Sequence, residues 1–347
     1  VTPEVDEKMM KFILFFSLLI STIFNANASN SYDTKEVSNF IDYMAKKHNY
    51  KKNDLRNLFN QIKEEKKLKK FFKKAPERRL TWNGCEQNEK QCINYKSLFV
   101  TDHNIKNGKL FIDENYNNLK KASETFGVPE EIIVAIIGIE TRYGKNLGNF
   151  KTFDTLASLS VGPNKGRRAE FYRTELENFL LLCRENNLDP SSIKGSYAGA
   201  LGKPQFISSS YRNYAIDFDG DSYADLWSSN ADVIGSVANY LEKNGWKRDG
   251  LILTDLVINN NEKTLEMLSN KTYKPHTKYI DYSNMNLKTS LAISDNEKLS
   301  VIKRLEGQSN VYSFGHNNFY TITRYNRSRL YALAVFTLAQ EIKMASQ

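Results

Sequence analysis

The sequence has few of the residues that form several common catalytic and metal-binding sites. Its 347 residues include four histidines, far apart in the chain, and three cysteines. So little histidine argues against a His-rich metal centre and against a Ser-His-Asp hydrolase. The chain also has no zinc-finger spacing and no RNA-binding signature, so a nucleic-acid-binding domain is not indicated.

The sequence also lacks an apolar run suited to crossing a membrane. The segment FILFFSLLISTIF follows Met9-Met10-Lys11 and precedes Asn25-Ala26-Asn27-Ala28. A basic start, an apolar stretch of about a dozen residues and an Ala-x-Ala ending predict a secretory signal peptide cleaved after Ala28. No cysteine follows the apolar stretch, so we expect no lipoprotein attachment and an exported, soluble mature chain.

The three cysteines are Cys85, Cys92 and Cys183. In an oxidising compartment Cys85 and Cys92 could close a short loop, although the sequence alone leaves this open. Cys183 lies in the apolar helical pattern FLLLCRE, which favours a buried free thiol.

Basic residues outnumber acidic residues and give a net charge of +9. Such a charge favours an anionic partner, which could be nucleic acid, anionic lipid or an acidic cell-wall polymer. The densest basic run, KKLKKFFKK at Lys66 to Lys74, has apolar residues at helical spacing. This spacing favours the solvated face of a helix over a dedicated binding patch.

Apolar periodicity predicts a mainly helical α+β protein with a small β-rich insert. We expect helices over 34–75, 113–126, 129–143, 168–185, 231–243 and 328–344, with a mixed segment at 76–112 that Gly84 and Gly108 interrupt. Residues 251–323 predict short strands, apart from a helix-like patch at 261–268. The expected parts are an N-terminal extension and signal peptide (1–28), an N-terminal helical domain (29–112), a core (113–250), a small β-rich domain (251–322) and a C-terminal helix that returns to the core (323–347).

Glu140 stands at the end of an apolar helix within GVPEEIIVAIIGIETRYG. A carboxyl that is half removed from water at a helix C-terminus should have a raised pKa, as a general acid for glycosidic cleavage requires. The alternative is a structural ion pair between Glu140 and Arg142 or another nearby cation. The residue pattern alone favours this alternative.

A second candidate site is the acidic run DFDGDSYAD, which begins at Asp217. Acids at alternate positions can direct oxygens at Ca²⁺, and a backbone carbonyl near Tyr223 could add another ligand. The run departs from the EF-hand pattern because Ser222 and Ser228 stand where glycine and a bidentate glutamate are usual. Asp232 could close a longer loop, and a polar turn without metal is the alternative.

Several segments together resemble the membrane-bound lytic murein transglycosylase B family. GVPEEIIVAIIGIETRYG, FDTLASLS, RRAEFY, GSYAGALGKPQF, SSSYRNYAIDFDGD, ADVIGSVANYLEKNGW and NNFYTITRYNRS recur in the family's order, over roughly Tyr95 to the C-terminus. The resemblance implies a lysozyme-like core, close to goose-type lysozyme, with a helical domain and a small β domain. It implies non-hydrolytic cleavage of the β-1,4 bond between N-acetylmuramic acid and N-acetylglucosamine in peptidoglycan. The muramyl C6 hydroxyl closes on C1 and leaves a 1,6-anhydro sugar.

The resemblance also assigns expected roles, residue by residue. Glu140 would be a single general acid and base, where ordinary glycosidases use two carboxylates. The residues expected to bind substrate are Tyr95, Arg167, Arg168, Ser196, Gln205, Tyr240, Tyr325, Asn326 and Tyr331, with the two arginines facing the peptide stem. The expected structural calcium ligands are Asp217, Asp219, Asp221, Tyr223 and Asp232, and no catalytic cofactor is expected.

Four features of this sequence depart from the family pattern. Tyr143 replaces a more usual tryptophan, Lys203-Pro204 replaces a small flexible pair before Gln205, and the spacing to Asp232 is one residue longer. The missing lipid-attachment cysteine favours a periplasmic form without an anchor. The expected partner is the peptidoglycan glycan strand, bound by a monomer that could join cell-wall synthesis or hydrolysis complexes.

Three other functions compete with this interpretation. A hydrolytic muramidase of the same fold would need a second carboxylate to activate water, and the sequence offers no good candidate. A non-catalytic peptidoglycan-binding or scaffold protein would tolerate the loss of Glu140. A calcium-dependent adhesion module would use the acidic run without cleaving glycan.

Overall fold

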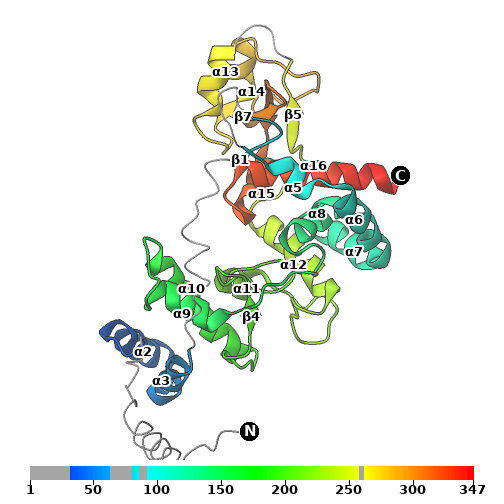
Figure 1. Ribbon diagram of the computed structural model, residues 1–347. Helices are drawn as coiled ribbons and strands as arrows, with labels where there is room; N and C mark the ends of the chain where they lie inside the picture. Colours follow the sequence, from blue (N-terminus) through cyan, green and yellow to red (C-terminus); the bar gives the residue numbers. More distant parts are fainter. Residues whose placement is uncertain (1–31, 63–79, 86–91, 258–261) are drawn as a thin grey trace, which may run out of the picture.

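The computed structural model describes residues 32–62, 80–85, 92–257 and 262–347. These residues are mainly helical, with a small sheet at one end of the molecule, so the predicted fold class is confirmed (Figure 1). The predicted signal peptide and the basic run Lys66 to Lys74 lie outside the described residues. Of the helices that the structure describes, none has the length and apolar character needed to cross a membrane.

Two N-terminal helices, α2 (Lys35–His48) and α3 (Lys52–Asn60), contact α9 (Thr152–Ser160) and α10 (Ala169–Glu185). Helix α2 begins where the Thr34 hydroxyl accepts from the Val37 N–H, as expected of an N-cap. The rings of Phe59 and Phe153 lie 5.2 Å apart, and the Tyr50 hydroxyl donates to the Leu180 carbonyl over 2.6 Å. These aromatic side chains therefore join the N-terminal helices to residues much later in the chain.

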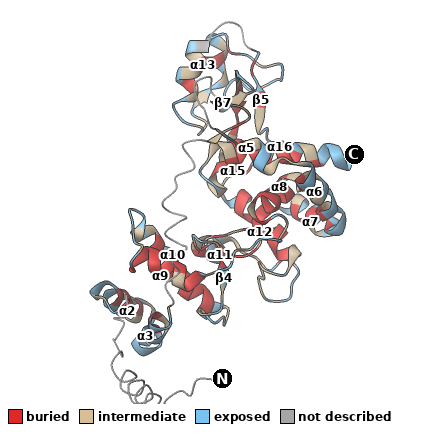
Figure 2. Ribbon diagram, in the orientation of Figure 1, coloured by how far each residue is buried: buried red, intermediate tan, exposed pale blue. Residues whose placement is uncertain are grey.

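The central helix is α8 (Glu130–Thr141), and residues 132–139 of it are all buried (Figure 2). Helices pack around it on every side, which explains why its sequence is apolar all round. Those in contact with α8 are α6 (Asp102–Glu114), α7 (Tyr116–Phe126), α12 (Asn230–Lys243) and α16 (Arg329–Ser346), and α5 (Tyr95–Phe99) packs in turn on α16.

Two predictions about the helices in this part are wrong. Helix α8 ends at Thr141 rather than near Tyr143, because Arg142 and Tyr143 take the left-handed φ values of 52° and 60°. Residues 102–112 are helical, although Gly108 was expected to interrupt them. A Cβ on Gly108 would lie 2.8 Å from the Tyr143 hydroxyl and closer still to Ile342, so this glycine permits close packing inside α6.

The described residues of the β-rich part contain four strands in the order β5-β8-β7-β6, with antiparallel neighbours. They are β5 (Leu253–Asp255), β6 (Thr277–Lys278), β7 (Lys298–Glu306) and β8 (Ser309–Gly315). Helix α13 (Glu262–Ser269) confirms the predicted helix-like patch, whereas α14 (Tyr279–Asn284) lies where a strand was predicted, and that prediction is wrong. These elements surround a core of their own, which includes Leu265, Tyr282, Leu299, Val301 and Phe314.

The predicted run of strands up to residue 323 is wrong at its end, because α15 (Asn317–Tyr325) is a helix. Phe319 and Ile322, three residues apart, are both fully buried in the main helical core. Spacing of three suits one face of a helix, and this face returns the chain from the insert to the core.

Short elements complete the fold. A two-residue parallel pair joins β1 (Leu80–Thr81) to β2 (Ile93–Asn94), and an antiparallel pair joins β3 (Phe150–Lys151) to β4 (Lys194–Gly195). Helix α11 (Ser208–Tyr214) precedes the acidic run. Cys85 and Cys92 form a disulfide with a Cα–Cα distance of 5.6 Å, and Cys183 is a buried free thiol, as expected.

Candidate active site

Glu140 lies in the last turn of α8 and is partly exposed, while the preceding turns are buried. Burial raises the pKa of its carboxyl from 4.5 to about 7, and a hydrogen bond from the Tyr331 hydroxyl opposes this rise. That hydroxyl donates to Glu140 Oε1 over 2.7 Å. The carboxyl can therefore hold a proton at neutral pH and can also release it.

No cation forms an ion pair with Glu140 among the residues that the structure describes. Arg142 is exposed and takes the left-handed conformation that ends α8. The competing interpretation, a structural ion pair with Arg142, therefore finds no support in the geometry. Thr141 instead fixes the turn to a loop 62 residues further along the chain, because its hydroxyl donates to the Lys203 carbonyl over 2.9 Å.

Three of the expected tyrosines form an aromatic wall beside Glu140. The rings of Tyr325 and Tyr331 are stacked at 6.3 Å with an interplanar angle of 11°. The Tyr240 ring lies 4.8 Å from the Tyr325 ring, edge to face. The Tyr325 hydroxyl donates to the Pro204 carbonyl and the Tyr240 hydroxyl to the Arg324 carbonyl, each over 2.6 Å. Their polar ends are thus fixed, and the pKa of Tyr325 rises through burial and then through the charge of Glu140.

Tyr95 reaches the same site from a different part of the chain. It is the first residue of the short helix α5, which packs on α16. Burial raises the pKa of Tyr95 to about 12, and the charge of Glu140 acts in the same direction. Tyr95 in turn contributes to the raised pKa of Tyr331, so the three groups lie within electrostatic reach of one another.

Gln205 and Ser196 lie on two loops that face the end of α8. Gln205 takes a left-handed φ of 51°, and its amide donates to the carbonyls of Gly202 and Leu147 over 3.0 and 3.3 Å. The Ser196 hydroxyl accepts from the Ala200 and Ala198 N–H groups over 3.0 and 3.3 Å, which closes the tight turn after it. Both side chains therefore also stabilise their own loops.

The remaining expected substrate contacts are exposed. Asn326 follows α15 directly and is exposed. Arg167 and Arg168 precede α10, and the Arg168 guanidinium lies 4.3 Å from the centre of the Phe171 ring. Arg168 is thus held over aromatic rings by a cation–π contact, and its exposed charge is available to an anionic group.

The acidic run brings Asp217, Asp219 and Asp221 together, with one carboxylate oxygen from each within 4.8 Å of the others. Asp217 accepts backbone N–H groups from Gly220 and Ser222 over 2.7 and 2.8 Å. Ser222, which replaces the usual glycine, adopts the glycine-like φ of 76°. Three exposed carboxylates on such a turn fit a hard cation such as Ca²⁺.

Asp232 does not join these three carboxylates. It is fully buried, and its two oxygens accept the N–H groups of Phe218 and Asp225, each over 2.7 Å. Asp232 thus holds both ends of the acidic run from the first turn of α12. Tyr223, expected to contribute its carbonyl, donates its own N–H to Asp221 over 2.9 Å.

The sequence interpretation missed several aromatic supports of the wall. The rings of Phe206 and Tyr214 lie 5.5 and 4.8 Å from the Tyr240 ring. Phe206 directly follows Gln205, a position that could have suggested this role, whereas nothing in the spacing connects Tyr214 to Tyr240.

A hollow of about 510 Å³ next to Leu147 is lined by residues 144–149, 192–194 and Trp227, and Glu140 is not part of its lining.

Comparisons with known proteins agree with this geometry. The family model of the transglycosylase SLT domain matches residues 33–340. Membrane-bound lytic murein transglycosylase B of Escherichia coli strain K12 is 36% identical over 311 residues, or 88% of this chain and 82% of that protein. The structure of the catenated lytic transglycosylase SltB1 from Pseudomonas aeruginosa superposes with a TM-score of 0.81 at 35% identity, covering 90% of this chain and 99% of the other. The Escherichia coli lytic transglycosylase Slt35 in complex with calcium gives a TM-score of 0.77 at 34% identity, covering 90% and 94%.

Proposed function

The chain belongs to the transglycosylase SLT family and is a lytic transglycosylase of peptidoglycan, and we propose that Glu140 is its single general acid and base. The observation that carries this proposal is a partly exposed carboxyl at the end of a buried apolar helix, which accepts from Tyr331 and has no paired cation among the described residues. This burial raises the pKa of Glu140 to about 7. A group with such a pKa can donate and then accept a proton near neutral pH.

The reaction follows from one carboxyl that changes role. Protonated Glu140 donates its proton to the glycosidic oxygen while the bond from that oxygen to C1 of the muramyl residue breaks. The muramyl C6 oxygen then bonds to C1, and its hydroxyl proton passes to the Glu140 carboxylate. The proton is thus returned, no water is consumed, and the products are a free 4-hydroxyl and a 1,6-anhydro end. Tyr331 stabilises the ionised form of Glu140 between the two transfers.

The aromatic wall and the neighbouring loops would bind the glycan strand. Tyr95 and Tyr325 are partly exposed near Glu140 and offer apolar ring faces against which sugar rings can pack, while the buried Tyr240 and Tyr331 support them from behind. Ser196, Gln205 and Asn326 offer hydroxyl and amide groups for sugar hydroxyls and acetamido groups. Arg167 and Arg168, exposed before α10, would bind carboxylates of the peptide stem.

Asp217, Asp219 and Asp221 would hold a structural Ca²⁺, and the Tyr223 carbonyl could complete the loop. Bound calcium would offset the repulsion among the three carboxylates and rigidify the turn that leads into α12. We place Asp232 outside the ligand set because both of its oxygens already accept backbone N–H groups. The proposed location is the periplasm, where peptidoglycan lies, with a monomer as the working form.

The decisive experiment digests purified sacculi and identifies the released muropeptides by mass spectrometry. We expect the unmodified protein to release 1,6-anhydro products, each lighter by one water than the product of hydrolysis. Glu140→Gln should abolish release. Glu131→Gln, a change of the same kind in the first turn of the same helix, should retain it, because Glu131 pairs with Lys343 at the surface. Products with free reducing ends would favour the hydrolytic muramidase, and full activity of Glu140→Gln would contradict the catalytic role.

A further inference from the structure

The segment that carries Tyr95 is held by a residue of the β-rich insert. Glu306 lies at the end of β7, and its carboxylate accepts from two side chains of the segment. Trp82 Nε1 donates to Oε1 over 2.8 Å, and Asn83 Nδ2 donates to Oε2 over 2.6 Å. Trp82 is 2% exposed, so at least one of these bonds forms away from water.

The backbone strengthens the same contact. The Asn83 N–H donates to the Leu305 carbonyl over 3.1 Å, and the Gly307 N–H donates to the Asn83 carbonyl over 2.6 Å. These two bonds involve the residues directly before and directly after Glu306. Residue 83 is therefore fixed to the turn between β7 and β8 by both backbone and side chain.

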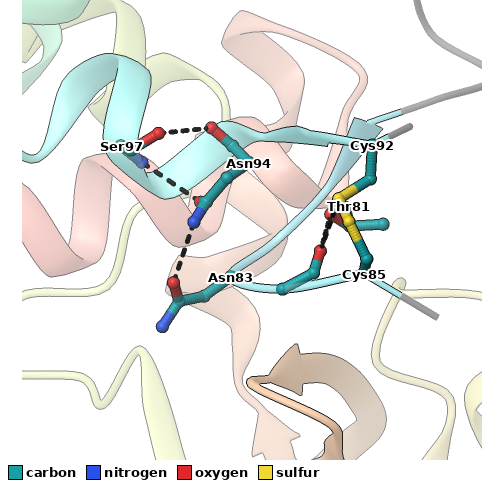
Figure 3. Close-up of a disulfide and its surroundings, with 7 residues drawn as sticks. Thr81, Asn83, Cys85, Cys92, Asn94 and Ser97 are labelled. Carbon is teal, nitrogen blue, oxygen red and sulfur yellow. Dashed lines mark hydrogen bonds between the residues drawn. A yellow bond between two sulfur atoms is a disulfide. The ribbon is translucent and has the colours of Figure 1, made fainter. Parts of the chain in front are cut away.

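A second set of contacts connects Asn83 to Asn94, which directly precedes Tyr95 (Figure 3). The Cys85–Cys92 disulfide closes the chain just beyond Asn83, and Asn94 Nδ2 donates to Asn83 Oδ1 over 3.0 Å. Asn94 is also the N-cap of α5, because its Oδ1 accepts the Ser97 N–H over 3.2 Å. Tyr95 directly follows this cap, so its backbone is fixed by a path that ends at Glu306.

Helix α5 could not orient Tyr95 by itself. It has five residues, none of them fully buried, and a helix of about one turn is unstable without external contacts. Its position depends on its packing against α16 and on the residues that precede it, which the Cys85–Cys92 disulfide fixes. A change at Glu306 should therefore alter the placement of Tyr95 while α8 and Glu140 keep theirs.

We propose that Glu306 is a positioning residue for Tyr95, which it holds in the glycan-binding site through Trp82, Asn83 and Asn94, beside the Cys85–Cys92 disulfide. The inference rests on the proposed role of Tyr95 as a glycan contact. It assigns the β-rich insert a part in substrate binding, although the insert has its own core and its described residues supply no hydrogen bond to Glu140.

The expected effect is a split between KM and kcat. Tyr95 would contact the glycan equally in the ground and transition states, so misplacing it should raise KM and leave kcat nearly unchanged. For soluble, uncrosslinked glycan strands we expect Tyr95→Ala to raise KM about tenfold and Glu306→Ala about three- to tenfold. Glu306→Gln keeps one carbonyl oxygen for one of the two donors and should give an intermediate KM.

A double-mutant cycle tests the proposed path. If Glu306 acts through Tyr95, Glu306→Ala should raise KM in the unmodified protein but have no further effect in Tyr95→Ala. Glu266→Ala is the matched control, because Glu266 binds Lys303 and Tyr312 within the same insert and does not touch the Tyr95 segment. It should leave KM unchanged, and thermal melts should show that every variant is folded.

The outcomes separate this inference from the proposed function. Additive effects of Glu306→Ala and Tyr95→Ala, or an unchanged KM in folded Glu306→Ala, would overturn the positioning role even if Glu140→Gln is inactive. An unchanged KM in Tyr95→Ala would also overturn it. An active Glu140→Gln would refute the catalytic proposal and leave the result of the cycle intact.

Discussion

The Tyr331 hydroxyl donates a 2.7 Å hydrogen bond to Oε1 of Glu140. Burial of both side chains raises their pKa values, and this bond favours the ionised form of the glutamate. Tyr331 therefore limits how far burial raises the pKa of Glu140. These two opposing effects leave the pKa of the Glu140 carboxyl at about 7, where one residue can serve as acid and then as base.

Replacing Tyr331 with phenylalanine should raise the pKa of Glu140 further, because the hydrogen bond to the carboxylate is lost while burial remains. A hydrogen bond to a charged group contributes about 1.5–3 kcal/mol, which corresponds to a shift of roughly one pH unit or more. In the pH profile of kcat/KM, the alkaline limb should move to higher pH by that amount. The measurement is the rate of glycan release between pH 5 and pH 9.

Tyr312→Phe provides the control for this substitution. The Tyr312 hydroxyl donates to Glu266 over 2.9 Å within the β-rich insert, so the same kind of bond is removed without changing the Tyr331–Glu140 bond. The profile of this variant should match that of the unmodified protein. A profile for Tyr331→Phe that keeps its alkaline limb would show that the hydrogen bond does not set the pKa of Glu140.

Glu140 should also make the stability of the protein depend on pH. Its pKa is about 7 in the folded state, against 4.5 for a glutamate in water, so between these values the folded state holds a proton that the unfolded state has lost. The free energy of unfolding should therefore fall as pH rises through this window, by about 1.4 kcal/mol per pH unit and about 3 kcal/mol in all.

Glu140→Gln removes this term, because its amide does not titrate. Denaturant melts at pH 5 and pH 8 should show the variant gaining stability relative to the unmodified protein at the higher pH. Other buried acids such as Glu175, whose pKa is also raised, are present in both proteins and cancel in the comparison. An equal difference in stability at both pH values would mean that Glu140 is not desolvated in the folded state.

The sequence predicted the apolar helix and the position of its acid, because both depend on local pattern. It could not predict whether Arg142 pairs with Glu140, because that depends on the left-handed turn at residues 142 and 143. This turn is stabilised by the Tyr143 side chain, which lies against Gly138 and donates to the Asn104 carbonyl over 2.7 Å. The partner, Asn104, is distant in sequence, and no local propensity reveals it.

The acidic run likewise has one feature that the local sequence pattern predicts and another that depends on contacts distant in sequence. Alternate acids at 217, 219 and 221 were sufficient to predict one cluster of carboxylates, and the structure forms it. Asp232 was expected to join as a ligand because it could close a longer loop and because the family resemblance implied it. The structure instead buries Asp232 in α12, where three backbone N–H groups donate hydrogen bonds to its carboxylate. Sequence spacing alone does not indicate that Asp232 would hold the acidic run in this way.

Calcium should stabilise the protein through this loop. We expect a rise in melting temperature of a few degrees when calcium is added to the EDTA-treated protein, since a ligand at 100 times its Kd contributes about 2.7 kcal/mol. Asp221→Asn should reduce the rise, because it removes one negative charge while keeping the oxygen that accepts the Tyr223 N–H. The measurement is a thermal melt at increasing calcium concentration.

Asp189→Asn is the matched control for calcium binding. Asp189 accepts from Ser191 in an exposed turn away from the acidic run, so its loss should leave the calcium effect unchanged. An unmodified protein whose melting temperature does not respond to calcium would contradict the proposed site.

Gly138→Ala should disturb the site without touching a catalytic group. A Cβ at this position would lie 2.6 Å from the Tyr143 ring and hydroxyl, so Tyr143 must move and pull on the turn that follows Glu140. Overpacking of this kind costs about 1–3 kcal/mol, and we expect that loss in denaturant melts together with a lower kcat on glycan strands. Gly166→Ala is the control, because a Cβ there meets nothing within 4 Å. If Gly138→Ala were as stable and active as Gly166→Ala, the contact between Tyr143 and α8 would not be what shapes the turn after Glu140.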